Sequence, residues 1–349
     1  MDNSTILNNI VHPQEQAVFK GMYSDMETGK AVLNPEQLGQ FLRYAQINST
    51  ILSMADFKLM KSFKKELTRV GIDGRVLQSG YTKEGATNPD LVPADVSFGV
   101  NELDAKKLKA TCQIEDDEKE DNLEQKQFEQ TLLSMMGERI GEDLEFWALF
   151  ADTTIQYDTN NLLSTTDGWI KTATNKLQSA GQKTAVSSGN EDFNLEEDTV
   201  ESMFDAMIYK LPLRFRQQRN NLVFFVPYEV EDAYRNLLKS RGTNLGDTTQ
   251  TGFGNLAYKG IPITYCPTLD AEDGRDIDDT ATSILTNPKN LAWGVWKNLS
   301  IEPERIPKNE TTKYWYRIRG DVDMYFREAA VVAKMTTEEA AALPLETKV

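Results

Sequence analysis

One amphipathic segment, residues 115–151, has the sequence EDDEKEDNLEQKQFEQTLLSMMGERIGEDLEFWALFA. Its apolar residues recur every three to five positions, with charged and amide side chains between them, as on one face of a helix. The acidic run 115–121 lies at the amino end, where the helix dipole favours negative charge. The segment therefore predicts a single helix over residues 121–151, about 45 Å long at about 1.5 Å per residue.

An extended stretch, residues 63–114, precedes this helix. It has strand-like alternation at 96–100 and a second extended run from Leu103 to Ile114, after a polar tip rich in glycine and proline. An isolated two-stranded ribbon buries too little apolar surface to be stable alone. We therefore expect the ribbon to lie on another subunit; an ordinary hairpin within one domain is the alternative. Residues 1–62 predict an arm with short helices, one of them over Ile51–Met60.

A second folding unit follows the long helix. Residues 152–192 are rich in Thr, Asn, Ser and Gly and predict a surface loop anchored by Trp169 and Ile170. Beyond this loop the pattern alternates between helices and short apolar runs, which is typical of an α/β unit. The predicted elements are a helix from Asn194 to Pro212, a buried strand at 221–226, a helix at 228–240, an edge strand at 261–265, and later strands at 291–295, 314–319 and 322–326.

The composition excludes several classes of protein. The 349 residues include 54 acidic and 38 basic side chains, one histidine and two cysteines, with a net charge of −16. Too few ligands exist for a zinc cluster or a disulfide scaffold, and no apolar run approaches the roughly 20 residues of a membrane span. The acidic balance argues against broad binding of nucleic acid. We expect a soluble protein of roughly two domains, without a secretory leader, made in a reducing cytoplasm.

No residue pattern supports catalysis, a cofactor or a metal. His12 lies in a polar arm, and Cys112 and Cys266 are expected to be buried or neutral thiols. Residues 252–257 match G-x-G-x-x-A, but no buried strand precedes them, so the dinucleotide interpretation fails. The acidic run 270–279 lacks the spacing of a calcium loop. We therefore expect no enzyme activity, no cofactor and no metal site.

Several degenerate segments, in this order and spacing, resemble one family. They are Val96–Val100 with Leu108–Asp121, then "NLVFFVPYEVEDAYRNL", "YKGIPITYCPTL" and "RIRGDVDMYFREAAVVAKM". The chain resembles the major capsid proteins of tailed phages, the Hong Kong 97-like family, whose fold is shared with encapsulins. The resemblance covers most of the chain from about Phe63 to Met335. It implies an α+β capsid fold with an N-terminal arm, an extended β-hairpin loop, a long spine helix and an α/β axial domain.

The resemblance also implies a division of the chain and a set of contacts. The arm would be 1–62, the extended loop 63–114, the peripheral domain 115–196 with 286–349, and the axial domain 197–285. No scaffold-like helical segment precedes the fold, so we expect a separate scaffolding protein. Lys83 could join subunits covalently, but no acceptor can be named. The candidate subunit-contact residues are Arg75, Tyr81, Lys83, Glu84 and Phe98 in the loop, and Gly252 and Phe253 at the axial end.

The resulting hypothesis is a structural subunit rather than an enzyme. It would assemble into pentamers and hexamers of an icosahedral shell, with a portal and packaged double-stranded DNA as further partners. That DNA would be bound without sequence specificity, and no membrane partner is expected. The location would be the virion capsid, after assembly in the host cytoplasm. Two alternatives stay open: an encapsulin-like nanocompartment shell, and a soluble two-domain hydrolase that uses carboxylate catalysis.

Overall fold

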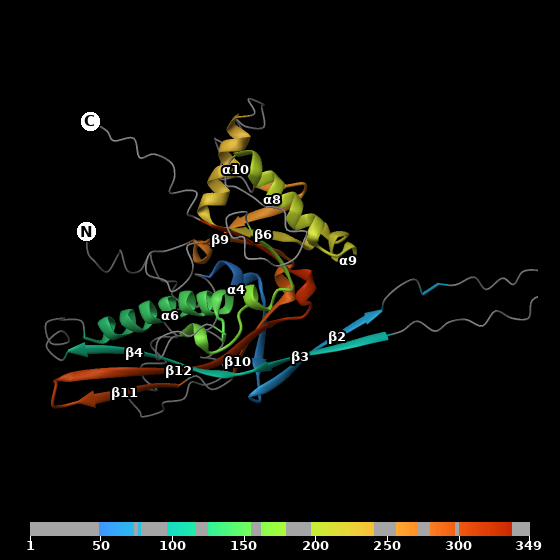
Figure 1. Ribbon diagram of the computed structural model, residues 1–349. Coiled ribbons are helices and arrows are strands. Elements are labelled where there is room, and N and C mark those ends of the chain that lie inside the picture. Colours follow the sequence, from blue (N-terminus) through green and yellow to red (C-terminus); the bar gives the residue numbers. More distant parts are fainter. Residues whose placement is uncertain are drawn as a thin grey trace, which may run out of the picture.

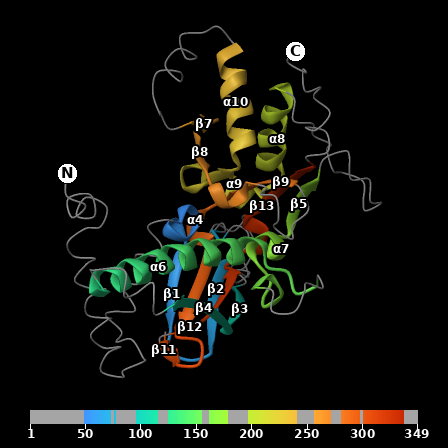
Figure 2. The same cartoon turned by 90° about the vertical axis from the view of Figure 1, so that its left-hand side faces the viewer.

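The computed structural model describes residues 49–72, 76–77, 96–115, 125–154, 162–178, 197–240, 256–270, 280–296 and 300–336. These residues form two sheets and a separate two-stranded ribbon (Figure 1). The long helix lies beside the five-stranded sheet, and two further helices accompany the six-stranded sheet (Figure 2). The expected mixed class of helices and sheets is therefore confirmed.

The five-stranded sheet is built around β12 (Thr311–Met324). Its first part pairs antiparallel with both β11 and β4, and its last part pairs antiparallel with β10, which is parallel to β1. The sequence predicted two strands here, but they are one continuous strand. Gly320 stands where β12 changes partner, and a Cβ there would lie 2.9 Å from the main-chain oxygen of Gly294. The partners are β1 (Asp56–Met60), β4 (Lys106–Glu115), β10 (Leu291–Trp296) and β11 (Ser300–Ile306).

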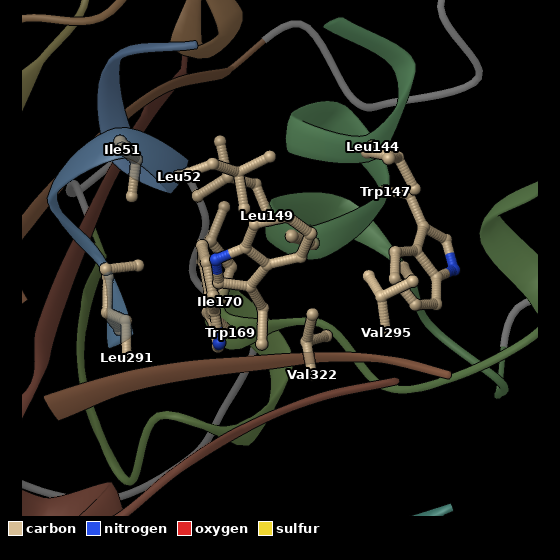
Figure 3. Close-up of a cluster of buried hydrophobic side chains, with 14 of the residues drawn as sticks. Ile51, Leu52, Leu144, Trp147, Leu149, Trp169, Ile170, Leu291, Val295 and Val322 are labelled. Carbon is tan, nitrogen blue, oxygen red and sulfur yellow. The ribbon is translucent and has the colours of Figure 1, made fainter. Parts of the chain in front are cut away.

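The predicted long helix is observed as α6 (Gln125–Phe150). Leu144 and Trp147 on its buried face belong to one apolar cluster with Val295 and Val322 of the sheet (Figure 3). Trp169, fully buried, joins the same cluster, and its indole nitrogen donates to the main-chain oxygen of Asp323 at 3.2 Å. The predicted anchor is thus confirmed, although the surrounding loop contains short elements. These are η1 (Leu162–Ser164), α7 (Trp169–Thr172) and β5 (Asn175–Gln178).

The six-stranded sheet has the order β5-β13-β9-β6-β8-β7. The side chain of Phe204 packs on Phe224 and Tyr234, with ring centres 4.7 and 5.6 Å away, and so joins the two helices to the sheet. The predicted elements of this unit are confirmed: α8 (Glu197–Lys210), β6 (Val223–Val226), α10 (Tyr228–Ser240) and β8 (Ile261–Tyr265). The remaining strands are β7 (Ala257–Tyr258), β9 (Thr280–Thr286) and β13 (Val331–Thr336).

Short helical turns connect these elements. They are α9 (Leu213–Arg216), η2 (Arg219–Asn221), η3 (Pro267–Leu269), η4 (Pro288–Asn290) and η5 (Arg327–Ala329). η3 follows β8, and its Leu269 is buried in the same cluster as α6. The unit of the six-stranded sheet is therefore packed directly against α6.

Three segments differ from their sequence-based expectation. The helix expected over Ile51–Met60 ends early: α4 covers Thr50–Met54, and β1 follows because its backbone pairs with β10. β4 was expected to continue the ribbon, yet it pairs along its whole length with β12. β13 was grouped with the long helix, yet it pairs with β9 and β5. Each difference arises from pairing between strands that are distant in sequence, which overrides local propensity.

Candidate assembly surfaces

A two-stranded ribbon extends away from the body of the molecule (Figure 1). Its strands are β2 (Lys64–Ile72) and β3 (Val96–Asp104), which are antiparallel and pair with no other strand of the described chain. The expected two-stranded excursion is thus present, with its second strand ending at Asp104. A ribbon of this kind buries little apolar surface by itself, so its stability depends on what holds its base.

The base of the ribbon is first held by a small apolar cluster, which lies on the face of the five-stranded sheet opposite α6. Met60, Leu67, Leu103 and Ala292 are buried together there. The contact is close, because a Cβ on Gly294 would lie 2.8 Å from the sulfur of Met60 and 3.0 Å from Leu103. The inner end of the ribbon is therefore packed against the sheet.

Polar side chains complete the attachment of the ribbon. The Arg69 guanidinium donates to the main-chain oxygen of Tyr325 at 3.1 Å and lies 5.6 Å from the Phe326 ring centre. Asn101 donates its amide hydrogens to the main-chain oxygens of Met324 and Tyr325. Because these acceptors lie at the end of β12 and on the residue that follows it, the direction of the ribbon is fixed relative to the sheet.

A buried carboxylate extends this attachment into the helix layer. Asp321 accepts from the main-chain nitrogen of Asp104 at 2.6 Å and from the Thr166 hydroxyl at 2.6 Å. Its side chain is almost fully buried, and burial raises the pKa of this carboxyl. The end of β3, the sheet and the loop after α6 therefore meet at one residue.

Apolar side chains are exposed further along the ribbon. Leu77 is 94 % exposed and Val76 and Val100 are each 54 % exposed. Leu77 is the most exposed large apolar side chain among those that the structure describes. Exposed apolar groups on a projecting element are typical of a surface that a partner covers.

A second buried carboxylate, Glu145, connects three parts of the molecule. This residue of α6 is 1 % exposed. One carboxylate oxygen accepts from the main-chain nitrogens of Ile51 and Leu52, at 3.1 and 3.4 Å. The other accepts from the Thr268 hydroxyl at 2.8 Å and from the Cys266 thiol at 3.3 Å. Burial raises the pKa of Glu145. Glu145 thus ties the end of the N-terminal segment and the turn after β8 to the long helix.

A cavity of about 310 Å³ lies beside the base of the ribbon. It is lined by parts of α9, η2 and η4 and by residues after β12, among them Leu222, Asn290 and Tyr325. At its rim the Arg214 guanidinium lies over the rings of Phe215 and Phe326, 4.5 and 5.5 Å from their centres, and pairs with Glu328. The cavity therefore offers aromatic and amide groups at the junction of the two sheets.

Most of the contact residues expected from the sequence lie outside the described residues. Phe98 is placed only through its backbone, which pairs with Val70 in the ribbon. The residues outside the description are Arg75, Tyr81, Lys83, Glu84, Gly252 and Phe253, with His12. Their roles stay predictions.

The thiols and the acidic groups show no reactive arrangement in the described part of the chain. Burial raises the pKa of both Cys112 and Cys266, which favours the neutral thiols expected from the sequence. Among the described residues no three His, Cys, Asp or Glu side chains are grouped to hold a metal ion. None of the described helices is both long and apolar enough to span a membrane.

Sequence reasoning missed the polar residues that attach the ribbon and the carboxylate within α6. Glu145 had a signal: it stands between Leu144 and Trp147 near the apolar face of the helix. A carboxylate at such a position needs donors. Asn101 and Arg69 gave no signal, because their acceptors are more than two hundred residues away in the chain.

Comparison with known proteins agrees with this architecture. No family model matches the chain. A Bacillus subtilis (strain 168) protein described as prophage capsid protein YqbE is 27 % identical over 319 residues, covering 89 % of this chain and 94 % of that protein. A chain of the satellite phage P4 procapsid, whose structure includes the size determination (Sid) protein, superposes with a TM-score of 0.62 at 12 % identity. That match covers 93 % of this chain and 98 % of the P4 chain. This chain has a phage capsid fold.

Two further structures support the same fold. A chain from the capsid of an empty GTA particle, computed with C5 symmetry, has a TM-score of 0.54 at 12 % identity, covering 83 % of this chain and 90 % of its own length. A chain from Mycobacterium phage Ogopogo has a TM-score of 0.51 at 10 % identity, covering 82 % and 92 %. In both comparisons the shared fold covers more than four fifths of this chain and at least nine tenths of the compared chain.

Proposed function

We propose that this chain is the structural major capsid protein of a tailed phage or prophage. The chain is a shell subunit, and its role is structural rather than enzymatic. The observation that carries this proposal is the projecting ribbon, which is attached at one end and exposes Leu77 and Val76 beyond it. A neighbouring subunit would cover these side chains in a shell. The compared proteins come from a prophage, a phage procapsid and a GTA capsid, which favours this function over a nanocompartment shell or a hydrolase.

The finer assignment is a Hong Kong 97-like fold. The ribbon is the extended loop, α6 is the spine helix of a peripheral domain with the five-stranded sheet, and the six-stranded sheet is the core of an axial domain. The arm before Ser49, with residues near Lys83, contacts neighbouring subunits. Gly252 and Phe253 lie at the centres of pentamers and hexamers. The order of elements and the match to the P4 procapsid chain support this assignment.

The partners follow from the same proposal. Subunits associate with one another in the virion capsid after assembly in the host cytoplasm, with a separate scaffolding protein and a portal. The shell encloses double-stranded DNA without specific contacts. Because the chain has a net charge of −16, isolated subunits repel this polyanion and bind it weakly at physiological salt.

The test is assembly of the purified full-length chain. The chain is produced alone and together with the scaffolding protein encoded beside it, and the products are examined by sedimentation and electron microscopy. We expect closed particles with pentamers and hexamers. A chain that stays monomeric in both preparations at concentrations of about 100 μM would refute the proposal. Subunits that form a shell are expected to associate with a dissociation constant below this concentration.

A further inference from the structure

The face of the five-stranded sheet opposite α6 carries a block of four cations. Successive residues of a strand point to opposite faces, so Leu108 of β4 and Ile318 of β12 are buried toward α6 and their neighbours point away. Those neighbours are Lys107 and Lys109 of β4, and Arg317 and Arg319 of β12. We call these four residues the basic block.

The register of the two strands sets like charges against one another within the basic block. Arg319 stands directly opposite Lys107, and Arg317 directly opposite Lys109. Like charges that face each other across two strands are destabilising. In a chain of net charge −16, two such pairs side by side point to an anionic group that neutralises them.

The described part of the chain neutralises the basic block only in part. Arg317 pairs with Glu302 at 2.7 Å. Arg319 lies 4.9 and 5.2 Å from the ring centres of Phe63 and Trp296. Lys107 and Lys109 are exposed, and no carboxylate of the described residues lies within ion-pair distance of either. Two cations of the basic block are therefore available to a partner.

The chain itself contains an anionic segment suited to this site. Residues 270–279, DAEDGRDIDD, hold six carboxylates and one arginine. Asp270 ends η3, and the strand β9 begins at Thr280, so both ends of the segment are attached to the unit of the six-stranded sheet. That unit lies on the opposite side of α6 from β11 and β12 (Figures 1 and 2).

The segment cannot reach the basic block of its own subunit. The nine residues 271–279 must leave and return, and at about 3.5 Å per residue they reach about 15 Å from their ends. A helix of about 10 Å diameter and a sheet lie between the ends of the segment and the basic block. The helix and the sheet together are about 20 Å thick.

We propose that the basic block binds the acidic segment 270–279 of a second copy of this chain. This inference rests on the proposed shell function and names one of its subunit contacts. The basic block and the residues at the two ends of the acidic segment, Asp270 and Thr280, belong to different units of the subunit. The contact would therefore be heterologous, the type of contact that closes rings or extends a lattice. A short carboxylate segment also matches the small extent of the basic block, whereas a long polyanion would extend beyond it along a chain of net charge −16.

The test exchanges the charges on the two sides of the contact. One full-length variant carries Lys107→Glu and Lys109→Glu, a second carries Asp276→Lys and Asp278→Lys, and a third carries all four changes. We expect the initial rate of assembly to fall at least about tenfold in each double variant and to return to within about threefold of the original in the combined one. The matched control is Lys61→Glu with Lys210→Glu, two exposed lysines outside the basic block, which should leave the rate unchanged.

A direct measurement separates this inference from the proposed function. Unlabelled and ¹⁵N-labelled subunits are mixed, joined with a carbodiimide that links amines to carboxylates, and analysed by mass spectrometry. We expect mixed-label links between Lys107 or Lys109 and residues 270–279. If shells form without these links, or if the combined variant assembles no better than the double variants, the contact is wrong and the shell function stands. If the basic-block variant changes only DNA binding in a filter assay, the occupant is DNA and the inference is overturned.

Discussion

The helix–sheet core and the ribbon differ in what holds them. Around α6, Trp147, Leu144 and Trp169 are buried against the five-stranded sheet from several directions (Figure 3). The ribbon has one small apolar cluster at its base, and its polar side chains donate to main-chain oxygens at the end of β12 and on the residue that follows it. The core is therefore stable within one subunit, whereas the ribbon is oriented by its subunit and needs a second surface to bury its outer part. A core that is buried within one subunit, together with an extension that a partner must cover, is expected of a protein that assembles.

The largest loss of stability should follow Trp147→Ala. Its side chain is 2 % exposed between α6 and the sheet, and its indole nitrogen donates to the Thr165 hydroxyl at 2.7 Å. Truncation of a buried aromatic residue costs about 3–5 kcal/mol, which chemical denaturation would measure as a lower free energy of unfolding. Trp315→Ala is the control, because Trp315 lies on the opposite face of the sheet and is partly exposed. Equal losses in the two variants would contradict the assignment of the core.

Removal of the buried carboxylate should rank second. Glu145→Ala leaves the nitrogens of Ile51 and Leu52 and the Thr268 hydroxyl without their acceptor. We expect a loss of about 2–4 kcal/mol, since unsatisfied buried donors are expensive.

The conservative change Glu145→Gln tests the titration of this group. Burial raises the pKa of Glu145, so the folded state holds the proton more tightly than the unfolded state. The stability of the original protein should therefore fall, relative to Glu145→Gln, as pH rises from about 4.3 through the raised folded pKa. Urea unfolding of both proteins between pH 4.5 and 8 measures this difference. A difference that does not change with pH would show that the carboxyl titrates normally.

A smaller, local effect should follow Asn101→Ala at the base of the ribbon. The change removes the bonds to the main-chain oxygens of Met324 and Tyr325, worth about 1–2 kcal/mol. Hydrogen exchange should become faster in β2 and β3 while α6 stays protected. Asn236→Ala, on the exposed side of α10, is the matched control. Faster exchange across α6 as well would mean that ribbon and core form one cooperative unit.

The smallest effect on stability should come from Leu77→Ser. Because Leu77 is 94 % exposed, the free energy of unfolding should change by less than about 0.5 kcal/mol. Shell formation should nevertheless decrease, as light scattering would record, because the partner loses an apolar contact. Leu213→Ser is the control, since Leu213 is 65 % exposed on α9 and is not part of the ribbon. Undiminished assembly would place the outer ribbon outside the subunit interface.

Local sequence predicted the elements whose pattern is complete within a few turns. The period of the apolar residues predicted α6, and the continuous apolar run at 223–226 with the pattern after Tyr228 predicted β6 and α10. Within the ribbon, the alternation at 96–100 predicted the first half of β3. The sequence did not predict the hydrogen bonds at the ribbon base or at Glu145, because each of those side chains bonds to a group in a distant part of the chain.

The sequence by itself determined the long helix, the α/β unit and the acidic balance, because helical period, apolar runs and charge are local properties. Only the tertiary structure decided that β4 leaves the ribbon for β12, that β12 is one strand, and that β13 joins β9. An extended segment carries the same alternation whichever strand it pairs with, and Lys106 finds its partner more than two hundred residues later at Gly320. That same pairing set the four cations of the basic block side by side, although the sequence keeps them far apart.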